Sequence, residues 1–242
     1  MKNMLITSKS NPIIKAVSAL ADKKFRKLYN QYIVEGIKPV RECIEAGCEI
    51  ERIICVEGLE GFEGATVVSE SVFKSISSEK TPQGVLAVVK MPQHSLKPPQ
   101  KSCLLLDCLQ DPGNLGTVIR TANAAGYDDI YMINCTDPYS PKAVRASMSG
   151  IFFVKIYQGS KDDIMGTLKD IPLVCADMNG ESIFEFNPPK LFCLCIGNEG
   201  SGISNEIKEQ ASYTVSIPMR STCESLNAAV SAGIAMYALR KN

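Results

Sequence analysis

The sequence predicts an α/β fold in two parts: a small α/β domain over residues 1–95 and a larger domain with a parallel sheet over 103–242, joined by a linker at 96–102. Apolar strand-like runs alternate with helical segments along the whole chain. A proline-rich stretch without apolar periodicity, "PQHSLKPPQK" at 92–101, separates the two parts. The strands of the second part are apolar throughout, which is typical of a parallel sheet covered by helices on both faces.

In the first part, apolar residues near helical spacing predict a helix over residues 12–30. Asn11 is placed to cap it, and Pro12 falls in its first turn. The remaining pattern is a short alternation of both element types. Strands are expected at 31–36, 50–58, 65–71 and 84–91, and helices at 37–47 and 70–78.

The second part begins with the apolar strand "CLLLD", followed by a Pro-Gly loop and a helix for which Asn114 is a candidate cap. The last helix is expected to begin around Glu224 and Ser225. Between them, strands are expected at 128–134, 152–159, 172–178, 190–200 and 215–218, and helices at 141–150 and 162–171.

Composition excludes several classes of protein. The chain has 242 residues, of which 45% are hydrophobic and 21% charged, so it can bury a core and is not disordered. No apolar run reaches the roughly 18 residues that a membrane-spanning helix needs. The first residues, "MKNMLITSKSNP", lack the apolar centre of a signal peptide. We therefore expect a cytoplasmic protein without a membrane partner.

The cysteines and the single histidine exclude further chemistry. Four of the ten cysteines, Cys103, Cys175, Cys193 and Cys195, lie in apolar strands, where cysteine acts as a small hydrophobe. No C-x-x-C pair occurs, so we expect reduced thiols and no metal site. His94 lies in the proline-rich stretch, which favours a solvated linker histidine over a catalytic base.

The charge is unevenly spread along the chain. Lys and Arg equal Asp and Glu overall, at 26 each, but residues 1–41 hold nine basic residues against two acidic ones. A basic leading segment indicates an anionic partner such as nucleic acid. The alternative is a helix face that is merely solvated, and charge alone does not separate the two.

Three motifs in the second part carry candidate chemistry. The first, "DPGNLGTVIRTANAAG", contains Asn114 and Arg120. An arginine in an apolar helix needs a partner, either a carboxylate such as Glu199 or Asp111, or a phosphate or substrate oxygen. The second, "IGNEGSGIS", places glycines after a strand, where backbone can approach a ligand. It matches neither the dinucleotide-binding nor the P-loop pattern.

The third motif is "IPMRSTCESLNAAVSAGI", in which a polar loop joins a strand to a helix N-terminus. The order and spacing of the three motifs resemble the SpoU (TrmH-type) family of RNA 2′-O-ribose methyltransferases, within the SPOUT superfamily. This resemblance covers residues 103–242. Residues 1–95 resemble, more loosely, the ribosomal-protein-like RNA-binding domain that precedes it in many members.

The resemblance implies a C-terminal SPOUT domain with a deep trefoil knot, bound S-adenosyl-L-methionine, a homodimer and methyl transfer to an RNA 2′-hydroxyl. Ser221 departs from the family pattern, which commonly has Gly there, and this puts the path of that loop in doubt. The implied site residues are Arg120, Asn114, Glu199, Ser225 and Asn227 for catalysis, and Gly197, Ile217, Met219 and Leu226 for the cofactor. The candidate RNA-binding residues are Lys9, Lys15, Lys23, Lys24, Arg26 and Lys27.

In the implied mechanism, Arg120 clamps a phosphate and the developing alkoxide, since a guanidinium stays protonated and cannot serve as the base. Glu199 is expected to orient Arg120, while Asn114 and Ser225 position the ribose. Ribosomal RNA is the expected substrate. The alternatives are a tRNA ribose methyltransferase, an enzyme that methylates a base, and an RNA-binding protein of the same fold without catalysis.

Overall fold

The computed structural model describes residues 5–240, so the outermost residues of the expected domains lie outside the described range. The described residues form two compact units, one of residues 5–92 together with 137–152, the other of residues 93–136 together with 153–240. The break at Pro92 lies in the proline-rich stretch. Residues 137–152 group with the first unit, whereas the expected bounds placed them in the second domain.

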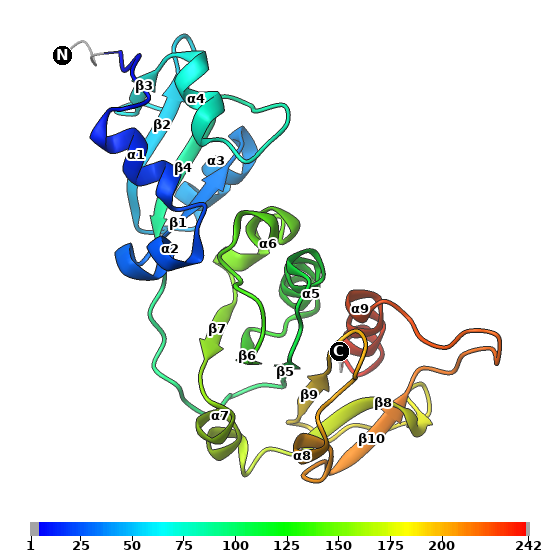
Figure 1. The fold of residues 1–242 in the computed structure, drawn as a ribbon. Helices are drawn as coiled ribbons and strands as arrows, with labels where there is room; N and C mark the ends of the chain where they lie inside the picture. The colour runs from blue at the N-terminus through cyan, green and yellow to red at the C-terminus, as the bar shows by residue number, and fades with distance from the viewer. Residues whose placement is uncertain (1–4, 241–242) are drawn as a thin grey trace. The chain divides into compact units, whose positions relative to one another are not determined.

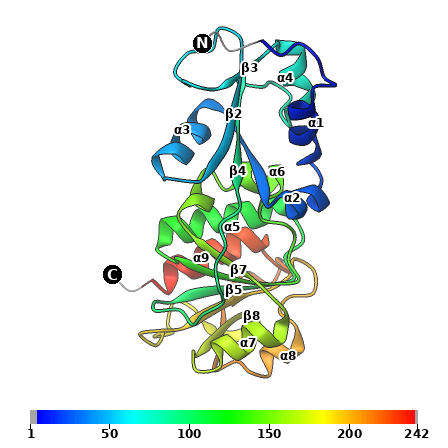
Figure 2. The ribbon, with the colours of Figure 1, turned by 90° about the vertical axis from the view of Figure 1, so that its left-hand side faces the viewer.

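The first unit is built on a four-stranded sheet of order β1-β4-β2-β3. β4 pairs antiparallel with β1 and β2, and β3 pairs parallel with β2. Helices α1 and α4 lie on one side of the strands and α3 on the other (Figure 2). The strands are β1 Gln31–Glu35, β2 Ile50–Val56, β3 Thr66–Val68 and β4 Val85–Lys90. The helices are α1 Pro12–Ala19, α2 Lys23–Tyr29, α3 Ile37–Glu45, α4 Glu70–Ile76 and α6 Pro141–Ala146, and a 3-10 turn, Gly150–Phe152, follows α6 (Figure 1).

The leading helical segment forms two helices where the sequence analysis expected one. The predicted cap is confirmed, because the Asn11 side chain accepts a hydrogen bond from the Ile13 amide at 2.9 Å. The break follows from a second cap: the Asp22 carboxylate accepts from the Lys24 amide at 2.8 Å and starts a new helix. That helix, α2, ends at Asn30, which adopts the left-handed conformation.

The second unit is a six-stranded sheet of order β10-β8-β9-β5-β6-β7, and every pairing in it is parallel. This confirms the parallel sheet expected from the continuous apolar strands. Helices α5 and α9 lie on one face of the sheet and α7 and α8 on the other (Figure 2). The strands are β5 Cys103–Asp107, β6 Asp129–Ile133, β7 Lys155–Gln158, β8 Leu173–Ser182, β9 Cys193–Ile196 and β10 Tyr213–Ser216. The helices are α5 Pro112–Ala125, α7 Lys161–Leu168, α8 Asn205–Lys208 and α9 Ala228–Ala238.

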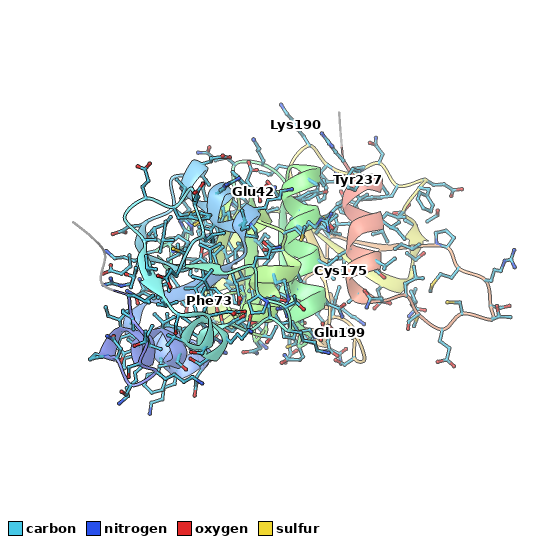
Figure 3. All side chains as sticks on the ribbon, turned by 90° about the horizontal axis from the view of Figure 1, so that it is seen from above. Glu42, Phe73, Cys175, Lys190, Glu199 and Tyr237 are labelled. Carbon is cyan, nitrogen blue, oxygen red and sulfur yellow. The ribbon has the colours of Figure 1, made fainter. Side chains whose placement is uncertain are left out.

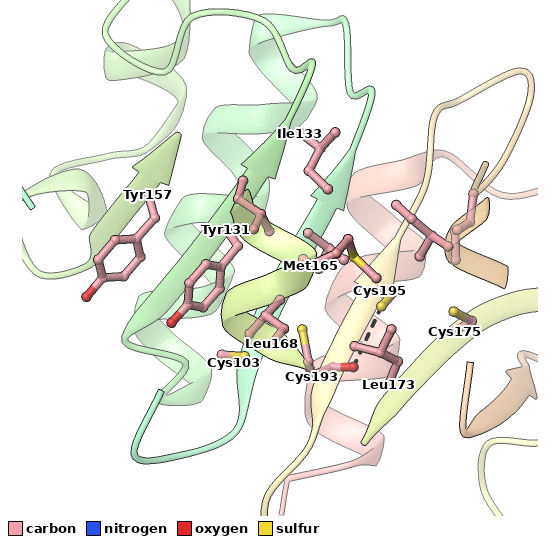
Figure 4. Packing of buried hydrophobic residues seen from close by; sticks show 14 residues of the cluster. Cys103, Tyr131, Ile133, Tyr157, Met165, Leu168, Leu173, Cys175, Cys193 and Cys195 are labelled. Atoms are coloured by element: carbon pink, nitrogen blue, oxygen red, sulfur yellow. Dashed lines mark hydrogen bonds between the residues drawn. The ribbon is translucent and has the colours of Figure 1, made fainter. Parts of the chain in front are cut away.

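The core between the sheet and α7 contains the four cysteines singled out from the sequence. Cys103 pairs with Cys193 in register, and Cys175 with Cys195, so their thiols lie among the apolar side chains of neighbouring strands (Figure 4). All ten cysteines are free. Burial is the main cause that raises the pKa of the Cys193 thiol far above its usual value. The thiols pack as small apolar groups, as the sequence analysis expected.

Two helix starts in the second unit differ from the expectation. Asp111, not Asn114, caps α5, because its carboxylate accepts from the Asn114 amide at 2.8 Å. α9 begins at Ala228 with Asn227 as its cap, later than the expected start around Glu224 and Ser225. In residues 5–240, no helix is long and apolar enough to cross a membrane, and no His, Cys, Asp and Glu side chains are grouped to hold a metal ion.

Candidate functional site

The glycine-rich loop after β9 is a tight hairpin that a side chain at its base would break. Asn198 and Gly202 exchange two backbone hydrogen bonds, at 2.9 and 3.1 Å, and Gly202 has a positive φ of 68°. A Cβ atom at Gly197 would lie 2.2 Å from the backbone of Gly202 and of Ile203. The position therefore needs glycine because two stretches of backbone touch there.

Three side chains from the three motifs form one hydrogen-bonded chain. The Asn227 amide nitrogen donates to Asn114 Oδ1 at 3.0 Å, and Asn114 Nδ2 donates to Glu199 Oε1, also at 3.0 Å. Asn227 Oδ1 in turn accepts from the Ala229 amide at the start of α9. Figure 3 shows Glu199 beside the end of α5. Residues from α5, the glycine-rich loop and the N-terminus of α9 thus hold each other in place.

Glu199 is ionised more readily than an ordinary glutamate. Partial burial raises the pKa of its carboxyl, but donors around it outweigh this effect and lower the pKa below 4.5. These donors are the Asn114 side chain and backbone amides, including those of Gln110 and Asp111. At neutral pH the site therefore contains a carboxylate held by neutral hydrogen-bond donors.

Next to the hydrogen-bonded side chains of Asn114, Glu199 and Asn227 lies a cavity of about 320 Å³, which is within the size range of small-molecule sites. It brings together six of the nine expected site residues, which come from two separate motifs: Gly197, Glu199, Ile217, Met219, Ser225 and Leu226. Asn114 and Asn227 join it through Glu199. Ile196, Val215 and Ala228 add apolar surface. The cavity thus combines apolar walls with backbone polar groups from the glycine-rich loop.

The cavity has a charged end that the sequence analysis missed. Lys208 Nζ lies 2.6 Å from Asp177 Oδ2, and both residues line the cavity. The ammonium group of Lys208 is the main cause that lowers the pKa of the Asp177 carboxyl. Nothing in the sequence pointed to the pair, because α8 was not expected and Asp177 lies inside an apolar strand.

Of the two interpretations of Arg120, the structural ion pair with Glu199 or Asp111 is not formed within the described residues, and the contact with a phosphate or substrate oxygen stays a prediction. Arg120 lies on α5 with its side chain exposed, and it pairs with no carboxylate in residues 5–240. Glu199 contacts Asn114 in this structure, and the expectation that Glu199 orients Arg120 stays a prediction. Arg120 needs no ion pair within the protein, because its guanidinium is exposed and solvated.

The loop at 217–227 accommodates the unusual serine. Ser221 is exposed and is not among the described residues with positive φ, so its Cβ atom causes no strain. Ser225 lines the cavity but is not the helix cap, a role that Asn227 takes. His94 is exposed, with its ring centroid 5.9 Å from that of Tyr157, and it does not line the cavity.

Five of the six candidate RNA-binding residues are exposed: Lys9, Lys15, Lys23, Lys24 and Lys27. Arg26 is not, and its selection was wrong. Its side chain is only 4% exposed and binds Asp137 through Nη2 at 2.7 Å. Arg26 Nη1 donates to the carbonyls of Leu20 and Ala21. Arg26 is the buried residue of α2, and these contacts keep its side chain pointing inward.

Comparison with known proteins agrees with this geometry. The sequence model described as SpoU rRNA Methylase family matches residues 101–237, and one described as MRM3-like substrate binding domain matches residues 11–87. The chain is 32% identical to the 23S rRNA (guanosine(2553)-2′-O)-methyltransferase RlmP of Bacillus subtilis (strain 168), over 97% of this chain and 98% of the relative. It is 28% identical to the 23S rRNA (uridine(2479)-2′-O)-methyltransferase of Streptomyces viridochromogenes, over 96% and 90%.

Among solved structures, the AdoMet-bound rRNA methyltransferase from Sinorhizobium meliloti superposes with a TM-score of 0.87. The two proteins are 29% identical, and the match covers 97% of this chain and 96% of the other. One kind of protein therefore matches both units of the chain. The chain belongs to the SpoU rRNA methylase family.

Proposed function

We propose that this chain transfers the methyl group of S-adenosyl-L-methionine to the 2′-hydroxyl of one nucleotide in ribosomal RNA. The observation that carries the proposal is the meeting of three distant motifs: Asn114, Glu199 and Asn227 form one hydrogen-bonded chain beside a cavity of about 320 Å³. The named activity of the full-length relatives, 2′-O methylation of 23S rRNA, supports it.

The residues around the cavity fit this cofactor. Ile217, Met219 and Leu226 provide an apolar wall suited to an adenine ring, and the Gly197–Gly202 loop offers backbone groups for its polar edge. S-adenosyl-L-methionine supplies a methyl group that its sulfonium already activates. The protein must then align donor and acceptor, which lowers the barrier by fixing their relative positions.

The chain's own residues divide the remaining tasks. Asn227 and Asn114 hold Glu199 through the bonds described above, and in this proposal Asn114, beside the cavity, and Ser225, which lines it, contact the ribose. Arg120, exposed and unpaired within the described residues, is free to bind an RNA phosphate and to stabilise the developing alkoxide. The proton leaves to water, to phosphate or to a carboxylate, since no histidine lines the cavity.

We also propose a homodimer and a knotted chain. α9 also presents apolar side chains on its exposed face, where Val230 and Tyr237 are 51% and 52% exposed, and a second copy of the chain would cover them. The knot is proposed from the family membership, and the sheet order, in which β9 lies between β5 and β8, accords with it. A cytoplasmic location accords with an RNA substrate.

RNA is proposed to bind the first unit through its exposed lysines. Lys9 and Lys15 line one hollow together with Ser18 and Ser75, and Lys23, Lys24 and Lys27 lie on α2. Such contacts make affinity fall as salt rises. Ribosomal RNA is favoured over tRNA because the rRNA enzymes match the chain over both units. Those relatives modify different nucleotides, a guanosine and a uridine, so the target base is not carried over.

The experiment compares ribosomal RNA from cells with and without this gene by mass spectrometry, looking for one missing ribose methyl group. Purified protein with S-adenosyl-L-methionine should restore it. Arg120→Ala should bind the cofactor normally, by isothermal titration, yet lose about 100-fold or more in turnover. Near-normal turnover of this variant would show that Arg120 has another role. Cofactor binding without any methyl transfer to RNA would favour a non-catalytic RNA-binding protein.

A further inference from the structure

The cavity contains one cationic side chain among the residues that line it. Its charged lining residues in the described part of the chain are Asp177, Glu199 and Lys208. Glu199 is committed to the hydrogen-bonded chain with Asn114. The remaining two form an ion pair of opposite charges at 2.6 Å, one from β8 and the other from the last residue of α8.

This ion pair is held in place and yet remains accessible. Asp177 Oδ2 contacts Lys208, while Oδ1 accepts from the Asn179 amide at 3.2 Å. The Asp177 side chain is 16% exposed and that of Lys208 is 36% exposed. Lys208 Nζ also lies 4.0 Å from where a Cβ atom of Gly202 would be, so it reaches the base of the glycine-rich loop.

The charges of the pair match one part of the proposed cofactor. Its methionine end carries one carboxylate and one ammonium group, and placing either in a cavity without a partner costs free energy. The carboxylate has one cationic counterpart among the lining residues, namely Lys208. Asp177, fixed beside it, offers an acceptor for the ammonium group. A ribose diol, by contrast, would use the Asp177 carboxylate and give Lys208 no contact with the ligand.

We propose that Lys208 and Asp177 bind the amino-acid end of S-adenosyl-L-methionine, Lys208 its carboxylate and Asp177 its ammonium group. This inference rests on the proposed function, because it assumes that cofactor. In this proposal the ion pair makes the cavity selective for the whole cofactor. Adenosine derivatives without an amino-acid end could fill the apolar part of the cavity, but they would make no contact with the pair.

The test uses isothermal titration of the full chain with two probes. S-adenosylhomocysteine has the amino-acid end, and 5′-methylthioadenosine keeps adenine and ribose without it. Lys208→Met should weaken the affinity for S-adenosylhomocysteine by about 10-fold to 100-fold, the usual contribution of a charge-assisted hydrogen bond. The affinity for methylthioadenosine should not change. Asp177→Asn should show the same selectivity.

The matched control is Lys161→Met. Lys161, on α7, pairs at 3.2 Å with Glu206, which lies on α8 like Lys208. Neither Lys161 nor Glu206 lines the cavity. This variant removes an ion pair from α8 and should leave both affinities unchanged. Melting temperatures verify folding, and Lys208→Gln replaces Lys208→Met if the latter does not fold. Lys208→Arg keeps the charge and should keep the preference for S-adenosylhomocysteine.

Equal weakening of both probes in Asp177→Asn would overturn the proposal, because it would place the ribose at this carboxylate. Equal weakening of both in Lys208→Met, or unchanged affinity for both, would also overturn it and leave the pair a structural brace between β8 and α8. Failure of the unaltered protein to bind S-adenosylhomocysteine or S-adenosyl-L-methionine would instead contradict the proposed function itself, and this inference with it.

Discussion

Removing the buried guanidinium of Arg26 should destabilise the first unit more than loss of a surface charge. Arg26 donates four hydrogen bonds: Nε and Nη2 to Asp137 Oδ2 at 2.9 and 2.7 Å, and Nη1 to the Leu20 and Ala21 carbonyls at 2.8 and 2.7 Å. In Arg26→Met, the Asp137 carboxylate, only 11% exposed, loses its counter-charge. Breaking a buried pair in this way costs about 3–5 kcal/mol.

Two further variants separate charge from packing. Arg26→Lys keeps the charge but cannot reach Asp137 and the two carbonyls with one ammonium group, so it should recover only part of the loss. Lys27→Ala on the same helix, an exposed residue, should change stability by no more than about 0.5 kcal/mol. Combining Arg26→Met with Asp137→Asn should cost less than the sum of the single changes, because the two side chains interact directly.

The assay is urea unfolding followed by circular dichroism, with hydrogen exchange on peptides from α2 and residues 137–152. Exchange is needed because a chain of two units need not unfold in a single step. A cost below about 1 kcal/mol for Arg26→Met would refute the reasoning. So would unchanged protection of 137–152. If Arg26 bound phosphate instead, its removal would reduce the salt slope of RNA binding by about one, and we expect no such change.

Three more changes test the site. Gly197→Ala should cost about 3 kcal/mol in urea unfolding and weaken cofactor affinity, because its Cβ atom would lie 2.2 Å from the backbone of Gly202. Asn227→Ala should lower stability by about 1 kcal/mol through loss of the α9 cap, measured as a fall in melting temperature. Because folding lowers the pKa of Glu199, its carboxylate stabilises the fold above pH 4.5, and this contribution is lost as pH falls further. The difference in unfolding free energy between the unaltered protein and Glu199→Gln should therefore shrink in acid.

The fold class followed from patterns that depend on local physics. Apolar runs without alternation predicted strands buried on both faces, and β5 and β9 are buried along their whole length. Boundaries were harder because capping residues compete. Asp111 and Asn114 are both good caps, and so are Ser225 and Asn227. Which member of each pair caps the helix depends on where the chain turns, and that is fixed by tertiary packing.

The sequence indicated which residues of the candidate site lie together where a motif dictates the backbone shape, but it did not indicate which side chains contact one another. Gly197 lies where the loop's own backbone makes a close contact, the contact with a ligand stays a prediction, and Leu226 lines the cavity. The partner of Arg26 is 111 residues away in sequence, on a segment assigned to the other domain, so no local pattern could indicate it. The choice of Asn114 rather than Arg120 as the partner of Glu199 likewise depends on which side chains reach the loop.

The order of the strands explains why distant motifs share one cavity. In a parallel sheet the carboxyl ends of all strands lie along one edge, where ligands bind. β9 is inserted between β5 and β8, and β10 adds beside β8. The loops that follow β5, β9 and β10 are therefore near neighbours, and they carry the three motifs. β8 lies between β9 and β10, so its own residues must border the same cavity. Asp177 is thus placed there by topology, which sequence order alone does not reveal.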